Sequence, residues 1–212
     1  MTRTRIKVCG ITRLDDALRA VELGVDALGF VFWPGSPRRV SLRQAAEIAA
    51  ALPPLVAAVG VFVDQPLDEI RTIASAVGLS AIQLHGDEAP GTWTSVPGRC
   101  IKAIGVGAGF DPAAVRAWPL AVLPLLDAHD PARRGGTGRI VGWDIAAELA
   151  RARRIILAGG LGASNIRDAI ARVRPFAVDV SSGVEREPGI KDPERLRAFI
   201  EGVAAADAGQ VP

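Results

Sequence analysis

Side chains that can transfer protons follow apolar runs at three places in this sequence. Cys9 and Asp127 each end a run of aliphatic residues, and His85 ends another. A thiol becomes a general base when it ionises, and a partly desolvated carboxyl group can hold a proton near neutral pH and act as a general acid. Each has an ordinary alternative, because free cysteine often fills a core and Asp127 could pair with Arg133 or Arg134. These residue types suit acid–base catalysis if the fold brings them together.

A lysine and the two histidines have structural interpretations that are favoured over catalysis or metal binding. Lys102 lies in a strand-like run, where a charge partner in the interior of a barrel is favoured over Schiff-base chemistry. His85 is more typical of a hydrogen-bonded structural residue than of a base. The second histidine, His129, stands in a long polar segment, and the sparse ligands predict no metal site.

Two loops rich in glycine and serine are the clearest sign of a ligand. Gly159 and Gly160 follow one apolar run, and Ser181, Ser182 and Gly183 follow the next. Backbone N–H groups in such loops, together with a helix amino terminus, can hold a phosphate group. Glycines that merely permit tight turns are the alternative, but the loops follow the seventh and eighth runs, where barrel enzymes bind phosphate. A phosphorylated small-molecule substrate is therefore predicted.

The elements that must position these residues alternate between strand and helix. Apolar runs typical of buried strands cover residues 6–9, 25–32, 55–63, 81–85, 100–104, 121–126, 154–157 and 176–180. Helical patterns cover 13–18, 41–52, 64–78, 111–117, 143–152, 164–173 and 193–205, while residues 86–97 are poorly patterned. Thr12 is placed to cap the first helix. A glycine-rich polar segment, residues 128–142, and a turn-rich loop from 181 to 191 are predicted to be irregular.

Eight strand–helix units predict the α/β class and a single (β/α)8 TIM barrel, because right-handed crossovers between parallel strands leave few other topologies. In a barrel, the carboxyl ends of all strands meet at one face, which would gather the candidate residues. The runner-up is an open doubly wound sheet. It would require fewer strands, and no dinucleotide-binding fingerprint is present.

Composition is consistent with one enzyme-sized domain, predicted at 1–206 with a frayed tail at 207–212. The 212 residues are 49% hydrophobic, with a mean hydropathy of +0.25 and a net charge of +2. The arginines are dispersed, which gives no support to nucleic-acid binding. The two cysteines form no disulfide framework, and neither a signal peptide nor a membrane span is evident. We expect a soluble cytoplasmic protein.

Short motifs along the whole chain closely resemble the phosphoribosylanthranilate isomerase family. They occur in the family's order, at residues 7–12, 29–32, 36–38, 60–63, 83–86, 126–127, 135–138, 158–161 and 179–185. The resemblance implies a step of tryptophan biosynthesis, the Amadori rearrangement of N-(5-phosphoribosyl)anthranilate to 1-(2-carboxyphenylamino)-1-deoxyribulose 5-phosphate. It also implies that no cofactor takes part.

The resemblance further implies roles for individual residues. Cys9 matches the family's general base and Asp127 its general acid. Arg38 matches the arginine that meets the anthranilate carboxylate, with Arg39 beside it as the other possible contact, and His85 is expected to bind substrate. The loops at 159–160 and 181–183 match the phosphate site.

Two other functions remain open at this stage. The related sugar isomerisation of histidine biosynthesis uses paired aspartates, whereas the first strand here ends in Cys9. A catalytically silent barrel that binds a phosphorylated metabolite would share the phosphate loops but show no turnover. The sequence does not decide between a monomer and a homodimer.

Overall fold

A closed barrel of eight parallel strands forms the centre of the molecule. The computed structural model describes residues 3–106, 110–127 and 142–209. The strands of the barrel are β1 (Arg5–Cys9), β2 (Ala27–Val31), β3 (Ala57–Phe62), β4 (Ala81–Leu84), β5 (Arg99–Gly105), β6 (Val122–Asp127), β7 (Ile156–Ala158) and β8 (Ala177–Val180). Each pairs with the next in sequence, and β8 pairs with β1 to close the ring. The predicted (β/α)8 barrel is confirmed.

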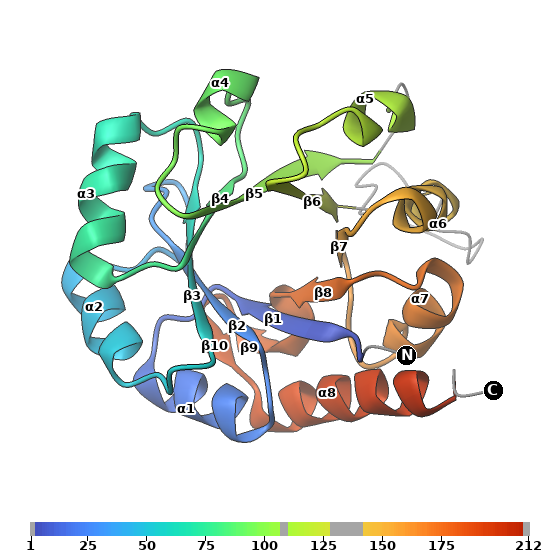
Figure 1. Cartoon of the computed structure of the whole chain (residues 1–212). Coiled ribbons are helices and arrows are strands. Elements are labelled where there is room, and N and C mark those ends of the chain that lie inside the picture. The colour runs from blue at the N-terminus through green and yellow to red at the C-terminus, as the bar shows by residue number, and fades with distance from the viewer. Residues whose placement is uncertain (1–2, 107–109, 128–141, 210–212) are drawn as a thin grey trace.

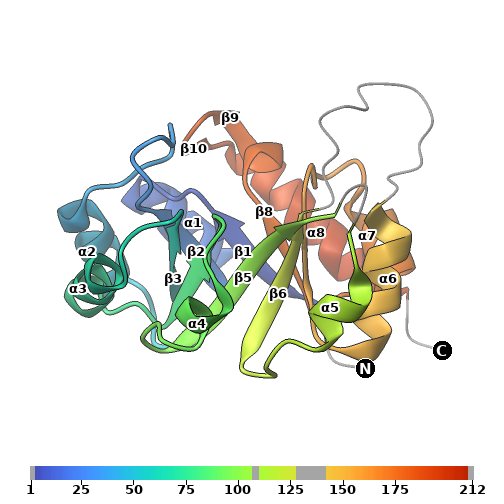
Figure 2. The same ribbon diagram turned by 90° about the horizontal axis from the view of Figure 1, so that it is seen from above.

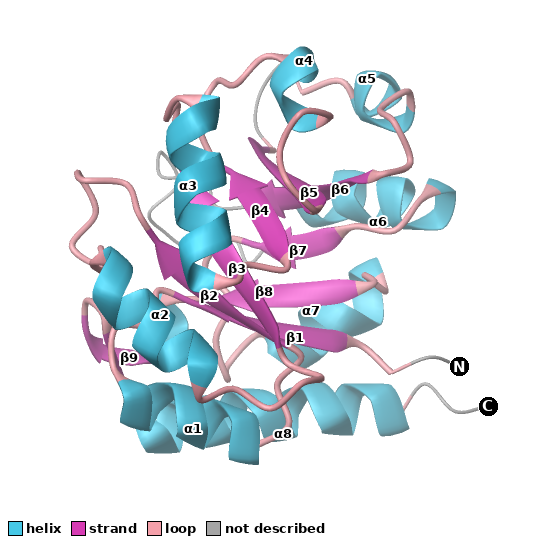
Figure 3. Ribbon diagram, turned by 60° about the vertical axis from the view of Figure 1, so that its left-hand side comes forward, coloured by secondary structure: helices cyan, strands magenta, loops and turns pink. Residues whose placement is uncertain are grey.

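Helices surround the barrel (Figures 1 and 3). They are α1 (Leu14–Glu22), α2 (Leu42–Ala50), α3 (Leu67–Val77), α4 (Pro90–Trp93), α5 (Pro112–Arg116), α6 (Gly142–Ala152), α7 (Ile166–Val173) and α8 (Pro193–Ala208). The poorly patterned segment after β4 contains only the single turn of α4. Among the described residues, no helix combines the length and the apolar character needed to cross a membrane.

Alternation along the strands divides the core into two parts. In β1, Ile6 and Val8 belong to the large cluster shared with the helices, while the residues between and after them face the barrel interior. Farther round the ring, Leu125, Ile156 and Ala177 are paired in register and belong to a second cluster, which fills the interior. Because both strand faces are buried, the strands read as nearly continuous apolar runs.

Two helices begin where the sequence predicts, and the one predicted cap, Thr12, is absent. Ser41 caps α2 in a reciprocal capping box with Gln44, and Asp111 caps α5 by accepting a bond from Ala113 N at 2.8 Å. Thr12, predicted to cap α1, does not do so. Its hydroxyl donates instead to the Gly189 carbonyl at 2.5 Å. This bond connects the loop between β1 and α1 to the turn at Gly189 near the end of the chain.

The segment predicted as an irregular loop from 181 to 191 has regular structure. It contains a 3-10 turn, Ser182–Val184, and an antiparallel hairpin of β9 (Glu185–Glu187) and β10 (Ile190–Lys191). Figure 2 shows this hairpin at the end of the barrel toward which β5 and β6 point, opposite the end where the two termini lie.

The last helix is longer than predicted. Helix α8 continues through Ala208, beyond the predicted domain limit at 206. The Asp207 carboxylate accepts bonds from the backbone N–H and the hydroxyl of Thr4, at 2.8 and 2.7 Å. Asp207 therefore fastens the end of the last helix to the start of β1.

Candidate active site

Cys9 ends β1 with its side chain facing the barrel interior, above a buried ion pair. Lys7 precedes it on the same face of the strand, and the Lys7 ammonium lies 2.8 Å from an oxygen of Asp179 on β8. Both charged side chains are almost completely buried. Neither residue was predicted from the sequence as a component of the site. Their signal is a charge inside an otherwise apolar strand, which is uncommon unless the charge has a partner.

Gly29 on β2 leaves the space that these side chains occupy. It is paired in register with Cys9, and a Cβ placed on it would lie 2.8 Å from the Cys9 sulfur and 3.1 Å from the Lys7 nitrogen. Both distances are shorter than ordinary contacts, so any side chain at Gly29 would displace the thiol or the ammonium group.

The electrostatic surroundings of Cys9 act in both directions. Burial raises the pKa of the Cys9 thiol above its usual value and outweighs the opposing effect of Lys7. The Asp179 carboxylate also raises this pKa, whereas Lys191 lowers it. The thiol form therefore predominates at neutral pH, and the thiolate is the minor, reactive form.

Asp127 and His85 lie at the carboxyl ends of two other strands. Asp127 ends β6 with a partly exposed side chain, and its backbone carbonyl accepts a bond from Val106 N at 2.9 Å. His85 directly follows β4, and its ring Nδ1 is 2.9 Å from Gln83 Nε2. Desolvation of the ring lowers the pKa of His85, while the Asp127 carboxylate acts to raise it, which shows that the two side chains share one region of the barrel mouth.

Arg38 is held over the same face by a carboxylate. Its guanidinium donates to Glu185 from Nε at 3.0 Å and from Nη2 at 2.6 Å, and its methylene groups pass over Gly10. Lys191 also donates to Glu185, at 2.8 Å, and to the carbonyl oxygen of Cys9, at 2.5 Å. Arg39, the other candidate, is exposed. The sequence analysis assigned no function to Glu185 or Lys191, since the hairpin that carries them was predicted as a loop.

The two predicted phosphate loops come together. Gly159 and Gly160 both adopt positive φ, at 90° and 61°, which other residues rarely do. Gly183 lies so close to the Leu161 carbonyl oxygen that a Cβ there would collide with it. Asn165 fixes the first loop by accepting from Gly162 N at 2.9 Å. The backbones after β7 and β8 therefore form one continuous surface at the barrel mouth.

Lys102 is a charge partner, but it does not face the barrel interior as predicted. Its neighbours Ile101 and Ala103 belong to the interior cluster, so alternation along β5 turns Lys102 toward the surrounding helices. Its ammonium lies 2.7 Å from Glu88 and also donates to the Gly86 carbonyl oxygen. The Glu88 carboxylate in turn accepts from the backbone N–H of Gly86 and of Asp64. These bonds fix the loop after β4, next to His85.

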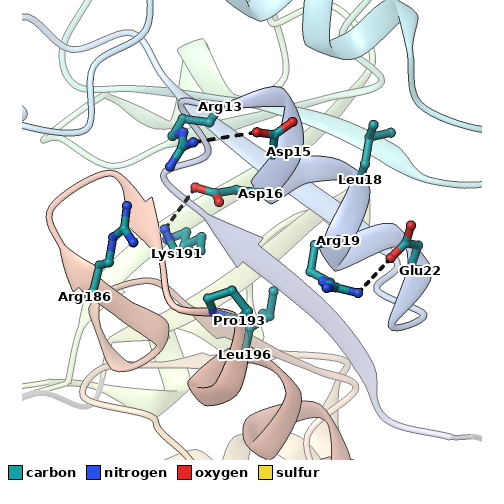
Figure 4. A pocket seen from close by; sticks show the side chains of 10 residues that line it. All are labelled: Arg13, Asp15, Asp16, Leu18, Arg19, Glu22, Arg186, Lys191, Pro193 and Leu196. Carbon is teal, nitrogen blue, oxygen red and sulfur yellow. Dashed lines mark hydrogen bonds and ion pairs between the residues drawn. The ribbon is translucent and has the colours of Figure 1, made fainter.

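A separate groove of about 480 Å³ lies outside the barrel (Figure 4). It runs between α1, the β9–β10 hairpin and the start of α8, and charges of both signs line it. It shares Lys191 with the site, and the backbone N–H of Lys191 donates to Asp16 at 3.0 Å. The polar segment with Arg133, Arg134 and the glycines at 135–138, and His129 with it, lies outside the described residues.

Comparison with known proteins identifies the family. Residues 6–202 match the family model described as N-(5'phosphoribosyl)anthranilate (PRA) isomerase. The isomerase of Pelobacter propionicus is 50% identical over 92% of this chain and 93% of its own, and that of Azotobacter vinelandii is 49% identical over 97% and 100%.

Solved structures agree with this relationship. The Thermotoga maritima isomerase superposes with a TM-score of 0.87 at 41% identity, covering 95% of this chain and 99% of its own. A second structure from that organism contains monomers generated from the dimeric protein. Another isomerase, with a TM-score of 0.85 and 41% identity over the same shares of the two chains, was solved with reduced 1-(o-carboxyphenylamino)-1-deoxyribulose 5-phosphate. The present chain is therefore a member of the N-(5'-phosphoribosyl)anthranilate isomerase family.

Proposed function

We propose that this isomerase rearranges N-(5-phosphoribosyl)anthranilate with Cys9 as general base and Asp127 as general acid. The product is 1-(2-carboxyphenylamino)-1-deoxyribulose 5-phosphate, and the step belongs to tryptophan biosynthesis. The observation that carries the assignment is the position of both residues at the carboxyl ends of barrel strands, at the face that also holds the paired loops after β7 and β8.

The reaction needs one proton donor and one proton acceptor. Asp127 protonates the furanose ring oxygen as the bond from that oxygen to C1′ breaks, and the nitrogen lone pair forms the C1′=N bond of a Schiff base. The Cys9 thiolate then removes the proton from C2′, and the electron pair moves through C1′ to nitrogen. The resulting enolamine tautomerises to the ketone. Two groups with different surroundings suit these opposite tasks.

The base is present as a minor thiolate fraction in the resting enzyme. Because burial raises the pKa of Cys9, the base becomes more abundant as pH rises. We therefore propose that the rate increases with pH across the neutral range until another group limits it.

The substrate's charged ends would be bound on different sides of the mouth. The loops containing Gly159, Gly160 and Ser181–Gly183 present backbone N–H groups for the phosphate. Arg38 would bind the anthranilate carboxylate through the edge of the guanidinium that Glu185 does not occupy, since Glu185 accepts from Nε and Nη2. His85, at the end of β4, would bind substrate between these two ends.

An assay with the substrate generated in situ tests the proposal. Purified protein should abolish the fluorescence of phosphoribosylanthranilate and yield the deoxyribulose product, identified by mass spectrometry. A silent barrel would bind a phosphorylated product analogue yet leave the fluorescence unchanged. Activity only on the sugar intermediate of histidine biosynthesis would also contradict the proposal.

We further propose that a second copy of the chain covers the amino-terminal end of the barrel. A largely apolar cavity of about 1020 Å³ opens there, beside Leu55 and Leu120, which are 95% and 92% exposed. Exposed leucines next to an apolar cavity favour association, and the Thermotoga maritima relative is dimeric. Light scattering should give a dimer for the wild type and a monomer for Leu55→Glu. A monomeric wild type would refute this interface.

The enzyme is proposed to act in the cytoplasm. The two cysteines are unpaired, and the base proposed for the reaction must stay reduced. Fractionation of cells that make the protein, followed by assay of each fraction, tests this location.

A further inference from the structure

The buried ion pair of Lys7 and Asp179 has no part in the proton transfers described above. The Lys7 side chain is 3% exposed and that of Asp179 is 9% exposed. The Lys7 nitrogen lies 2.8 Å from the nearer carboxylate oxygen of Asp179. Burying two charges is costly, and replacing such pairs with apolar residues is often neutral or stabilising. Stability therefore does not account for a charged pair at this position, directly beside the proposed base.

The fold places the side chains of Lys7 and Cys9 next to each other in the barrel interior. Alternation along β1 places both side chains on the interior face, two residues apart. On the neighbouring strand β2, Gly29 has no side chain to separate them. The position that a Cβ atom would take at Gly29 is 2.8 Å from the Cys9 sulfur and 3.1 Å from the Lys7 nitrogen, so both groups border the same small space. Asp179, paired in register with Lys7 from β8, holds the ammonium from the other side.

Charged groups from several elements of the described structure act on the thiol. Lys7 comes from β1 itself and Asp179 from β8, while Lys191 comes from the β9–β10 hairpin. Arg38, from the loop after β2, also interacts with Cys9. Lys7 has the largest effect of these groups in favour of the thiolate, through both its charge and a hydrogen bond. Asp179 opposes the thiolate through its charge, but it also accepts a hydrogen bond from the Lys7 ammonium at 2.8 Å, which holds that group in place.

We propose that Lys7 is a positioning residue for the base: its ammonium group stabilises the Cys9 thiolate, and Asp179 orients that ammonium group. This inference rests on the proposed role of Cys9. During the reaction Lys7 keeps its protons, and the proton from substrate C2′ goes to the Cys9 sulfur. When Cys9 takes up the proton and loses its charge, the Lys7 ammonium remains paired with the Asp179 carboxylate. The positive charge of Lys7 is therefore balanced at every step of the reaction.

The two members of the pair should shift the titration of Cys9 in opposite directions. Lys7→Gln removes the favourable charge and should raise the thiol's pKa by about one unit or more. Asp179→Asn removes the unfavourable charge and keeps an oxygen acceptor for the ammonium, so it should lower this pKa by about one unit. A purely structural role of the pair would move both variants in the same direction or move neither.

Alkylation of the free enzyme measures this titration directly. Iodoacetamide labelling of the Cys9 peptide is followed by mass spectrometry from pH 6 to 10, which separates it from Cys100. At pH 7 the labelling rate should fall about tenfold in Lys7→Gln and rise about tenfold in Asp179→Asn, the changes that one pKa unit produces. Lys102→Gln is the matched control, because it removes another buried lysine whose partner is Glu88, and its Cys9 profile should match the wild type.

The labelling profiles can contradict the proposed role of Lys7 in two ways. Equal Cys9 profiles in wild type and Lys7→Gln, or slower labelling in both variants of the pair, would overturn it. Thermal melting monitored by circular dichroism identifies a variant that does not fold. Should Lys7→Gln fail to fold, Asp179→Asn alone decides through the sign of its shift. The rising limb of kcat against pH should move with the labelling profile, while KM stays within about twofold.

The test separates this inference from the proposed function. Labelling needs no turnover, so an inactive wild type with the expected shifts would contradict only the role of Cys9 in isomerisation. If the wild type is active but its Cys9 labelling profile is the same in Lys7→Gln, only the present inference is contradicted.

Discussion

Arg38 and Glu185, 147 residues apart in sequence, form a bidentate ion pair with 2.6 Å between Nη2 and the nearer carboxylate oxygen. The pair holds the guanidinium of a loop residue in one orientation above the barrel mouth. A fixed guanidinium can bind a planar carboxylate through two parallel bonds, which lysine cannot do. This relationship underlies the first prediction.

Arg38→Met should weaken binding of the natural substrate by about 2 kcal/mol, the usual value for a hydrogen bond to a charged group. The measurement is kcat/KM for the natural substrate and for an analogue with aniline in place of anthranilate. The analogue has no carboxylate to lose, so the mutation should affect it much less. Arg39→Met is measured in parallel and should change kcat/KM little with either substrate. Equal losses with both substrates in Arg38→Met would mean that Arg38 only supports the loop.

Cys9→Ser and Asp127→Asn should each lower kcat by about 10²–10⁴, because each removes a proton-transfer group. Binding of a phosphorylated product analogue, measured by calorimetry, should change little. The free energy of unfolding should also stay close to that of the wild type. Wild-type turnover in either variant would remove that residue from the mechanism.

Gly29→Ala should reduce activity although it adds only one methyl group. The new Cβ would lie 2.8 Å from the Cys9 sulfur, so the thiol must move, and overpacking of this kind costs about 1–3 kcal/mol of stability. Gly91→Ala is the matched control, since a Cβ there meets nothing within 4 Å. Urea unfolding and kcat are measured for both. If Gly29→Ala kept both wild-type values, the close packing around the base would be disproved.

Glu185→Gln should destabilise the protein by about 3 kcal/mol near neutral pH, because it leaves Arg38 and Lys191 with no carboxylate partner. Burial alone would raise the pKa of Glu185, but hydrogen bonds from Arg38 and Lys191 bring it below its usual value. A lowered pKa in the folded state contributes stability above the unfolded value of about 4, and that contribution disappears as pH falls through the folded value. The difference between wild type and variant should therefore shrink below about pH 4. A pH-independent difference in urea unfolding would contradict this.

Much of the fold could be predicted because each strand of the barrel is buried on both faces. Such strands give continuous apolar runs, and their repetition at regular spacing leaves a barrel as the simplest solution. The start of the helix at Ser41 could be predicted equally well, since the bonds of its capping box are local. Thr12 was misjudged because its partner, the Gly189 carbonyl, comes from a distant segment. No local pattern reports such a contact.

The same distinction applies to the site. Cys9, Asp127 and the glycine loops could be found because strand ends share one face in a barrel. The partnership of Lys7 with Asp179 and that of Arg38 with Glu185 depend on which strands and loops become neighbours when the ring closes. Sequence pattern identifies such charges as unusual, but only the closed barrel pairs them.

Closure of the ring by β1 and β8 has a consequence for biosynthesis. Strand β1 is made first, yet its second partner is complete only at Val180. A nascent chain that ends before that point exposes one edge of β1, with unpaired backbone groups that can recruit other chains. Its buried lysine, Lys7, also lacks the carboxylate of Asp179. The base therefore gains its charged surroundings in the same late event that removes the aggregation-prone edge.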